Sequence, residues 1–462
     1  MADAGSSKRL GIALAAGVVA LAVGWRACEG QRRAETDRQA QGPATPSTAD
    51  AESTSPSASS DAPGAPGASG LSAPIAAAHL ANGNVIVAGL DVSAKAIRVQ
   101  RIDVKDAIVA ERVALDDVAW SPDSELKVSV HATQGVAVTW RGLRGGKLVR
   151  ELVILGPDLA PKGEPEEVAA ASCVTRDALW FSDDAQASSR PWSGASLKID
   201  LPKEKDVSLL CGASHAFAVL GEEDHTSILP LGAPFPGPAG TRQPLTVVRE
   251  GDFGDDEQRE LAQYTVGDDV GVVRIGGSGA VAVREIVGGV LGPLRKLKAT
   301  IPKDDDVVAV DASPKVLAIV YTEDASASCP PGAAGPGDGV VATKVMSLRV
   351  DRETLEESTT ELAPGRCGHE IGPFFTDLLG DDVAIAWTER SGGAGSARAP
   401  ITGIAHALVA RTGRPAVART AQPADALVDA GCDGTRCYAA ALVRRDAADA
   451  SAPGFVKVLR YK

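Results

Sequence analysis

The chain is poor in aromatic residues and in positive charge. Phe, Trp and Tyr together make up 4% of its 462 residues, and the formal net charge is −13. Stacking platforms for bases need aromatic side chains, and sugar rings are gripped by similar flat apolar faces. Proteins that bind nucleic acid also neutralise phosphates with clustered Lys and Arg. We therefore predict no nucleic-acid partner, and carbohydrate binding is disfavoured.

Long apolar runs are also scarce, and the longest stands near the N-terminus, at residues 10–25. As a helix it would span roughly 24 Å, against a hydrocarbon core of roughly 30 Å, although Arg9 and Arg26 could snorkel. We predict that residues 1–28 form a signal-anchor or transmembrane helix that makes the membrane a partner. A cleaved export signal is one alternative, and lipidation of Cys28 is another.

Residues 29–73 contain almost no large apolar side chains and are rich in Ala, Pro, Ser and Gly. Such a segment buries too little surface to offset its ordering entropy. We predict a disordered linker that spaces the folded part from the membrane; a disordered tail with no spacing role is the alternative. The remaining residues, 74–462, are predicted to form one domain.

This domain contains a repeated apolar run that ends in a polar turn. The copies start about 50 residues apart on average, at Val85, Val136, Ala178, Ala216, Val270, Val316, Val383 and Cys437. Short runs rich in Val and Ile between turn residues indicate strands. Most copies are followed by a strand with one polar face, and several are preceded by a third apolar element.

This grading from fully buried to half-solvated strands is what a β-propeller blade requires. We predict an all-β fold, a seven- or eight-bladed β-propeller preceded by an N-terminal hydrophobic helix and a disordered tether. Separate β-sandwich domains are the rival architecture, but no second linker like residues 29–73 divides the domain.

One segment, VAWSPDSELKVSV from Val118, resembles the S-P-D-G turn of WD40-type and TolB-type propellers. Ser121, Pro122 and Asp123 match the turn, and Ser124 stands where Gly is usual. The resemblance implies the fold and no activity. Usage rich in Ala, Gly and Arg and poor in Lys suggests an exported protein from a bacterium of high GC content.

Six cysteines remain besides Cys28, and an even number suits an oxidising compartment. Cys432 and Cys437 stand at the two ends of a four-residue strand connection, where they are within disulfide reach. Cys173 and Cys211 each precede a core run, and Cys329 and Cys367 lie in Pro/Gly-rich excursions. We predict these three pairs as disulfides. With the anchor, they place the domain in the periplasm, on a single-pass protein of the bacterial inner membrane.

No catalytic, cofactor or metal site is predicted. None of the 6 histidines lies beside a nucleophile in a recognisable pattern, and Cys367 with His369 is the nearest approach to zinc-ligand spacing. Acidic pairs such as Asp268 with Asp269 are interpreted as solvated turns, with calcium binding or carboxylate catalysis as alternatives.

Two functions remain open. The first is a membrane-tethered module that binds or scaffolds a protein or cell-envelope partner without catalysis. The second is a hydrolase or lyase with a carboxylate site at the propeller axis. Acidic or histidine side chains converging at the axis would favour the enzyme, and apolar or small residues there would favour the binding module.

Overall fold

A computed structural model describes residues 71–461, apart from short gaps at 81, 132, 184, 193–194, 203–205, 222–224, 232–243, 250–251, 253–257, 304, 330–341, 392–400, 411–416, 420–425, 433–434 and 445–453. The predicted helix over residues 1–28 and nearly all of the predicted linker lie outside this part of the chain. In the described ranges, no helix is long and apolar enough to cross a membrane.

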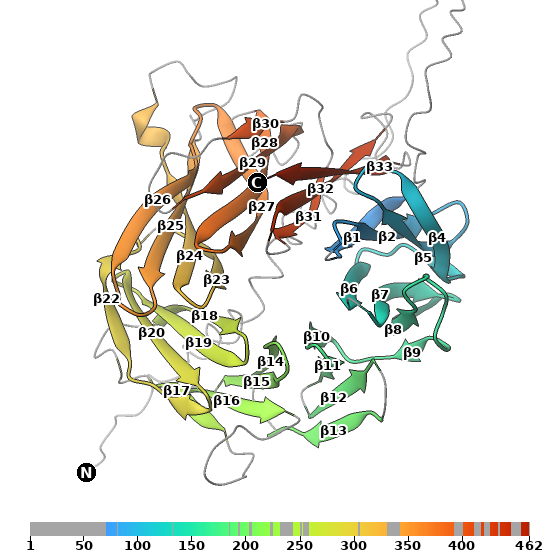
Figure 1. Ribbon diagram of the computed structural model, residues 1–462, viewed down its shortest axis with the longest axis horizontal. Helices are drawn as coiled ribbons and strands as arrows, with labels where there is room; N and C mark the ends of the chain where they lie inside the picture. The colour runs from blue at the N-terminus through green and yellow to red at the C-terminus, as the bar shows by residue number, and fades with distance from the viewer. Residues whose placement is uncertain are drawn as a thin grey trace, which may run out of the picture.

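The described strands form eight antiparallel sheets arranged as blades around a central axis (Figure 1). Blade 1 comprises β1 (Ser72–His79), β2 (Val85–Asp91), β3 (Ala96–Ile102) and β4 (Ile108–Leu115). Blade 2 comprises β5 (Val118–Ala119), β6 (Glu125–His131), β7 (Gly135–Arg144), β8 (Lys147–Leu155) and β9 (Glu166–Glu167). Blade 3 comprises β10 (Ala171–Val174), β11 (Ala178–Ser182), β12 (Gln186–Pro191) and β13 (Leu197–Asp200). Blade 4 comprises β14 (Asp206–Cys211), β15 (Ala216–Gly221), β16 (His225–Leu231) and β17 (Leu245–Arg249).

The second half of the ring repeats the same meander. Blade 5 comprises β18 (Gln258–Val266), β19 (Asp269–Gly276), β20 (Ala280–Val287), β21 (Val290–Leu291) and β22 (Arg295–Thr300). Blade 6 comprises β23 (Val307–Ala312), β24 (Val316–Asp324), β25 (Thr343–Asp351) and β26 (Glu357–Ala363). Blade 7 comprises β27 (His369–Leu379), β28 (Asp382–Ser391), β29 (Ile401–Val409) and β30 (Ala418–Arg419). Blade 8 comprises β31 (Ala426–Cys432), β32 (Cys437–Arg444) and β33 (Gly454–Tyr461).

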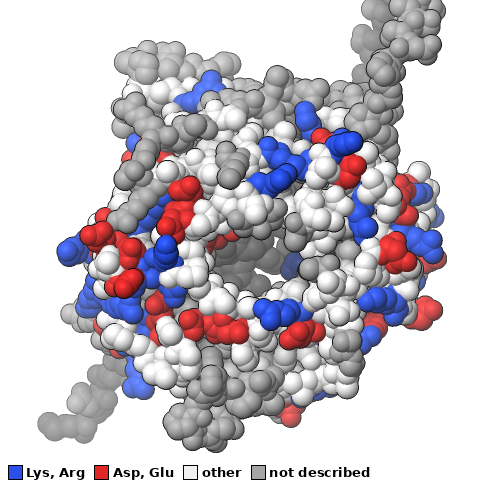
Figure 2. Space-filling view, viewed as in Figure 1, with Lys and Arg blue, Asp and Glu red and all other residues white. Residues whose placement is uncertain are grey.

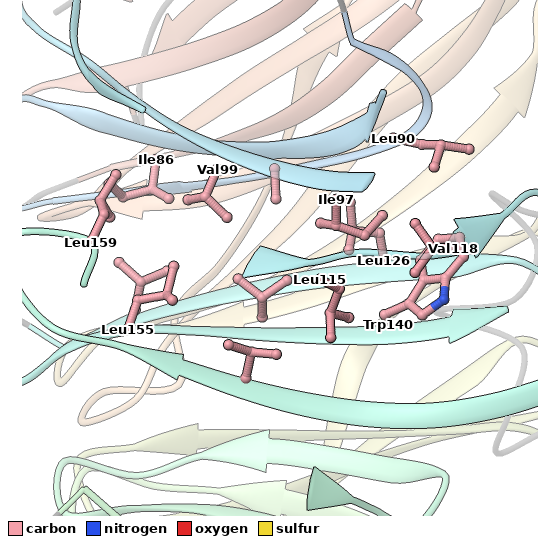
Figure 3. Close-up of a cluster of buried hydrophobic side chains, with 14 residues drawn as sticks. Ile86, Leu90, Ile97, Val99, Leu115, Val118, Leu126, Trp140, Leu155 and Leu159 are labelled. Atoms are coloured by element: carbon pink, nitrogen blue, oxygen red, sulfur yellow. The ribbon is translucent and has the colours of Figure 1, made fainter. Parts of the chain in front are cut away.

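The repeated apolar runs are the second strands of the blades. Every residue of β2 is buried, because blades pack against both of its faces, whereas the outer strand β4 alternates between half-buried and exposed positions. Figure 3 shows one such interface, where Ile86 and Val99 of blade 1 lie over Leu155 of blade 2, and Leu90 of blade 1 lies over Trp140 of blade 2. The prediction of an all-β propeller with graded strands is confirmed, and the number of blades is eight.

The ring closes where its two ends meet. The backbone N–H of Gly454 donates to the carbonyl of Leu71, so the residue before β1 extends the three-stranded last blade. The Arg460 guanidinium of β33 donates to the Asp106 carboxylate at 2.9 Å and to the Asp103 carbonyl at 2.8 Å, both in blade 1. Because β1 begins at Ser72, the folded part starts slightly before the predicted boundary at residue 74.

Candidate functional site

The face of blade 2 that meets blade 3 is polar at its inner end. Side chains alternate between the two faces of a strand, and Leu126, Val128 and Val130 of β6 pack toward blade 1. The alternate residues therefore face blade 3, and they are Glu125, Lys127, Ser129 and His131. In contrast, the inner strands of blades 6 and 7 meet through Ala309, Phe374 and Leu378. The inner strand of blade 2 therefore meets blade 3 through polar side chains, whereas the inner strands of blades 6 and 7 meet through apolar ones.

A cavity of about 290 Å³ occupies this place, lined by β1, β6, β10 and β31 at the axis and by β7 and β11 behind them. Figure 2 shows the hollow at the centre of the ring. Its wall combines polar side chains with apolar ones, and these are Lys127, Ser129, Thr139, Ser172 and Asp429 against Val128, Val174, Leu179 and Phe181. The cavity therefore has the mixed wall of a small-molecule site, at the lower end of the usual size range.

Positive charge collects beside this cavity. Arg141 of β7 and Arg150 of β8 lie directly opposite each other in the ladder, an arrangement in which like charges repel. A narrow crevice lined by both arginines adjoins the cavity and shares Lys127, Thr139 and Ser172 with it. The Glu125 carboxylate contacts Lys127 Nζ at 3.0 Å and Arg150 Nη2 at 3.6 Å.

This single carboxylate leaves the cluster short of negative charge. Arg141 has no ion-pair partner among the residues that the structure describes. Burial lowers the pKa of Arg150, and although Glu125 opposes this shift, the positive charge of Arg141 lowers that pKa further. The blade 2–3 site, by which we mean this cavity and its adjoining cationic crevice, therefore carries three cations against one anion in its polar end.

A second group of ionisable residues lies on the inner strands of three successive blades, and one of its members, Asp429, also lines the cavity. Asp311 of β23, Asp377 of β27 and Asp429 of β31 each stand opposite an alanine of the second strand, which leaves room for the carboxyl group. Thr376 Oγ1 donates to Asp311 Oδ2 at 2.6 Å, which joins blade 7 to blade 6. The Cys432 backbone N–H donates to Asp377 Oδ2 at 2.7 Å, which joins blade 8 to blade 7.

The third carboxyl group belongs to the seam where the ring closes. Tyr438 OH donates to Asp429 Oδ2 at 2.9 Å, and the Tyr438 ring stacks on His79 of blade 1 at a centroid distance of 4.6 Å. A Cβ on Gly431 would lie 3.3 Å from both Asp377 Oδ2 and Tyr438 OH, so glycine permits the two groups to approach each other.

Burial makes these carboxyl groups hard to ionise. It raises the pKa of Asp311 to about 7 and that of Asp429 to about 7, and the charge of Asp377 adds to both shifts. Burial also raises the pKa of Asp377. Because desolvation disfavours the charged form, these groups act as hydrogen-bonded links between blades. Within the described ranges, no three His, Cys, Asp or Glu side chains converge in a way that could hold a metal ion.

The cysteines form the three predicted pairs. Cys173 of β10 is joined to Cys211 of β14, which links the inner strands of blades 3 and 4. The Cys432–Cys437 disulfide closes the hairpin between β31 and β32. The third links Cys329, in the connection after β24, to Cys367, just before blade 7. Cys367, whose spacing from His369 was compared with that of zinc ligands, is therefore bonded to Cys329 in a disulfide.

The other residues singled out in the sequence are spread around the ring. Asp268 lies at the turn before β19, where its Oδ1 accepts hydrogen bonds from the backbone N–H groups of Ser214 at 2.6 Å and His215 at 3.0 Å. Although burial opposes the shift, these two donors hold the pKa of Asp268 below its usual value. His131 of blade 2 and His406 of blade 7 pack against Trp192 of blade 3 and Tyr461 of blade 8, respectively, so they serve the packing between neighbouring blades.

The cationic residues of the blade 2–3 site were missed by motif analysis. Lys127, Arg141 and Arg150 come from three strands, and no short sequence pattern joins them. A local signal did exist, because Glu125, Lys127, Ser129 and His131 alternate with apolar residues in a strand that should be buried on both faces. An inner strand with one polar face indicates a cavity where that face meets the next blade.

No known protein-family model matches the chain, and no curated protein matches it in sequence. Solved structures with similar folds include the WD40 domain of SCAP from fission yeast, at 10% identity and a TM-score of 0.40, covering 74% of this chain and 88% of that one. Another is a post-proline cleaving enzyme from Rickettsia typhi, at 10% identity and a TM-score of 0.42, covering 79% and 57%. Kuenenia stuttgartiensis hydrazine synthase has 12% identity and a TM-score of 0.34, covering 87% and 99%. Similarities of this size carry no information about activity.

Proposed function

We propose that the protein is a binding or scaffold module that a membrane anchor in residues 1–28 holds on the periplasmic side of the bacterial inner membrane. The observation that carries the binding role is the cavity at the axis, whose wall is built mainly from small, apolar and hydroxyl side chains, with Lys127 and Asp429 as its charged residues. Its partner is a protein or cell-envelope molecule whose exposed group enters this cavity. An eight-bladed propeller fits such a role, because its loops and axis present one rigid surface.

The disulfides support a location outside the cytosol. Three cystine pairs are engaged within the domain, and structural disulfides persist in oxidising compartments. The apolar run at residues 10–25 supplies the anchor, and residues 29–73 supply the spacing from the membrane.

A hydrolase or lyase with a carboxylate site at the axis is the second candidate. It is favoured by Asp429, which accepts a hydrogen bond from the Tyr438 hydroxyl, and by Asp377, whose Oδ2 lies close to Gly431 as that hydroxyl does. The binding role is the better supported of the two, because these carboxyl oxygens already accept hydrogen bonds from Cys432 and Tyr438.

The location is tested by fractionating bacteria that express the full chain. We expect the protein in carbonate-washed membranes, with its domain degraded when protease is added to spheroplasts. Val18→Asp, in the middle of the apolar run, should release it from the membrane, whereas Ser47→Asp in the linker should not.

The redox state of the cysteines gives an independent test of the proposed location. A thiol reagent added to denatured, non-reduced protein should label Cys28 at most. A soluble protein in the cytosol, with two or more further thiols labelled, contradicts the proposed location.

A further inference from the structure

We propose that the partner's exposed group, which enters the blade 2–3 site, is an organic acid, with its anionic group at Lys127 and the neighbouring hydroxyl groups and its apolar body against Val174 and Phe181. This inference rests on the proposed binding function and names the chemistry of the ligand. No metal or cofactor is needed for it.

The charge balance favours an anion. Among the described residues, Lys127 and Arg150 share one carboxylate, that of Glu125, and Arg141 stands opposite Glu125 in the ladder without forming an ion pair. Arg141 and Arg150 stand opposite each other and repel, and the Arg150 side chain is 16% exposed, so solvent screens it incompletely. A second carboxylate in the cavity relieves this repulsion, and charge-assisted hydrogen bonds to Lys and Arg are the strong ones.

The hydroxyl groups on the wall can complete the anion's contacts. Ser129 and Thr139 lie on the face of blade 2 that looks toward blade 3, and Ser172 lies on β10 opposite them. No hydrogen bond within the described part of the chain uses the side-chain oxygen of any of the three. Each hydroxyl is therefore available to donate to a carboxylate.

The apolar side of the cavity selects an organic acid over an inorganic ion. Leu179 and Phe181 belong to the core between blades 2 and 3 and also line the cavity, as does Val174. A dry cavity of about 150 Å³ holds one benzene molecule. The cavity of about 290 Å³ therefore accommodates roughly ten to twelve non-hydrogen atoms, the size of an arylalkanoic acid.

One acidic residue of the wall, Asp429, is compatible with an anionic ligand. Its Oδ2 accepts a hydrogen bond from Tyr438, which belongs to the adjacent strand of blade 8. Burial raises the pKa of Asp429 to about 7, so a large fraction of this group is neutral near pH 7. It therefore adds less repulsion than an exposed carboxylate would.

The test measures calorimetric binding of three probes of matched shape to the full chain at low salt and pH 7. These are 3-phenylpropionate, 3-phenylpropanol and 3-phenylpropylamine. We expect the acid to bind at least about tenfold more tightly than the alcohol, and the amine more weakly than both. Binding of the acid should weaken as salt is raised. Equal binding of all three, tighter binding of the amine, or no binding of the acid overturns the inference.

Variants locate the anionic group. Lys127→Gln and Arg141→Gln should each weaken binding of the acid about tenfold, while Arg112→Gln, an exposed arginine on β4, changes it less than about twofold. Glu125→Gln removes the competing carboxylate and should strengthen binding about threefold. If all four variants bind alike although the thermal unfolding of each is normal, the anion lies elsewhere and the inference fails. Failure here leaves the fractionation result intact, so the two proposals are judged separately.

Discussion

The blade 2–3 site and the three aspartates of blades 6 to 8 deal with polar groups at the axis in opposite ways. Asp311 and Asp377 each accept a hydrogen bond from the next blade, and the inner strands around them pack tightly. At the blade 2–3 site, Lys127 lines the cavity and is paired with Glu125, whereas Arg141 lines the adjoining crevice without an ion pair among the described residues. Buried polar groups that are paired within the protein are structural, whereas cations that exceed the carboxylates beside a cavity are available to a ligand. The comparison separates a region that holds the ring together from one that is open to binding.

The largest effect is expected when a large side chain is removed from the tightly packed core between blades 6 and 7. Trp387 of β28 is 1% exposed in the core between blades 6 and 7. Trp387→Ala should lower the free energy of unfolding by about 3–5 kcal/mol, measured by urea denaturation. Lys127→Ala, at a half-exposed side chain of the cavity, should cost less than about 1 kcal/mol. Similar losses for both variants would mean that the cavity wall supports the fold as much as the core does.

The two disulfides nearest these regions provide the next test. Cys173–Cys211 closes a loop with a sequence separation of 38 beside the cavity, and Cys432–Cys437 closes one of 5 beside Asp377. Loop-closure entropy predicts that the double serine variants lose about 4 and about 2 kcal/mol, respectively. Denaturant midpoints under non-reducing conditions measure both losses. A larger loss for the Cys432–Cys437 pair would show that its value lies in positioning the Asp377 hydrogen bond.

The last test concerns pH. Burial raises the pKa of Asp311 in the folded protein to about 7, from 3.8 for an ordinary aspartate, so the folded state holds this proton more tightly than the unfolded state does. The stability that this group contributes is complete below about pH 4 and is lost as pH rises to about 7, by at most about 1.4 kcal/mol per pH unit. Asp311→Asn keeps an acceptor for Thr376 and should unfold at a higher temperature than the parent at pH 8, but not at pH 4. Asp116→Asn, at an exposed side chain, should follow the parent at both values; an Asp311→Asn curve parallel to the parent's would show that the carboxyl is not buried in solution.

The sequence was sufficient for the fold because each blade repeats a local pattern. The run from Val85 to Asp91 coincides with β2, and that from Val316 to Asp324 coincides with β24. The blade number stayed open because blade 3 has short strands and because blade 8 completes itself with Leu71, far away in the chain. The disulfides could be predicted, since equivalent positions of neighbouring repeats lie side by side in a ring.

The site could not be predicted in the same way. Arg141 and Arg150 become neighbours through the register of β7 and β8, and their position beside Ser172 depends on how blade 3 packs against blade 2. Alternation in β6 was the one local clue. The aspartates had a similar clue, since each ends an apolar run on an inner strand, as Asp311 does in VVAVD, but their burial depends on contacts between blades.

The hydrogen bond between Gly454 and Leu71 places a condition on biosynthesis. Blade 1 emerges first from a ribosome or a secretion channel, yet the face it presents to blade 8 stays uncovered until β33 has followed. During this interval Val85 and Val87, which are buried in the finished ring, are exposed to any chaperone or protease in the compartment. Because the chain is made from its N-terminus, the packing of blade 1 is completed only after blade 8 has been synthesised. A nonsense mutation after Arg444 removes β33 and should therefore leave Val85 and Val87 of blade 1 exposed.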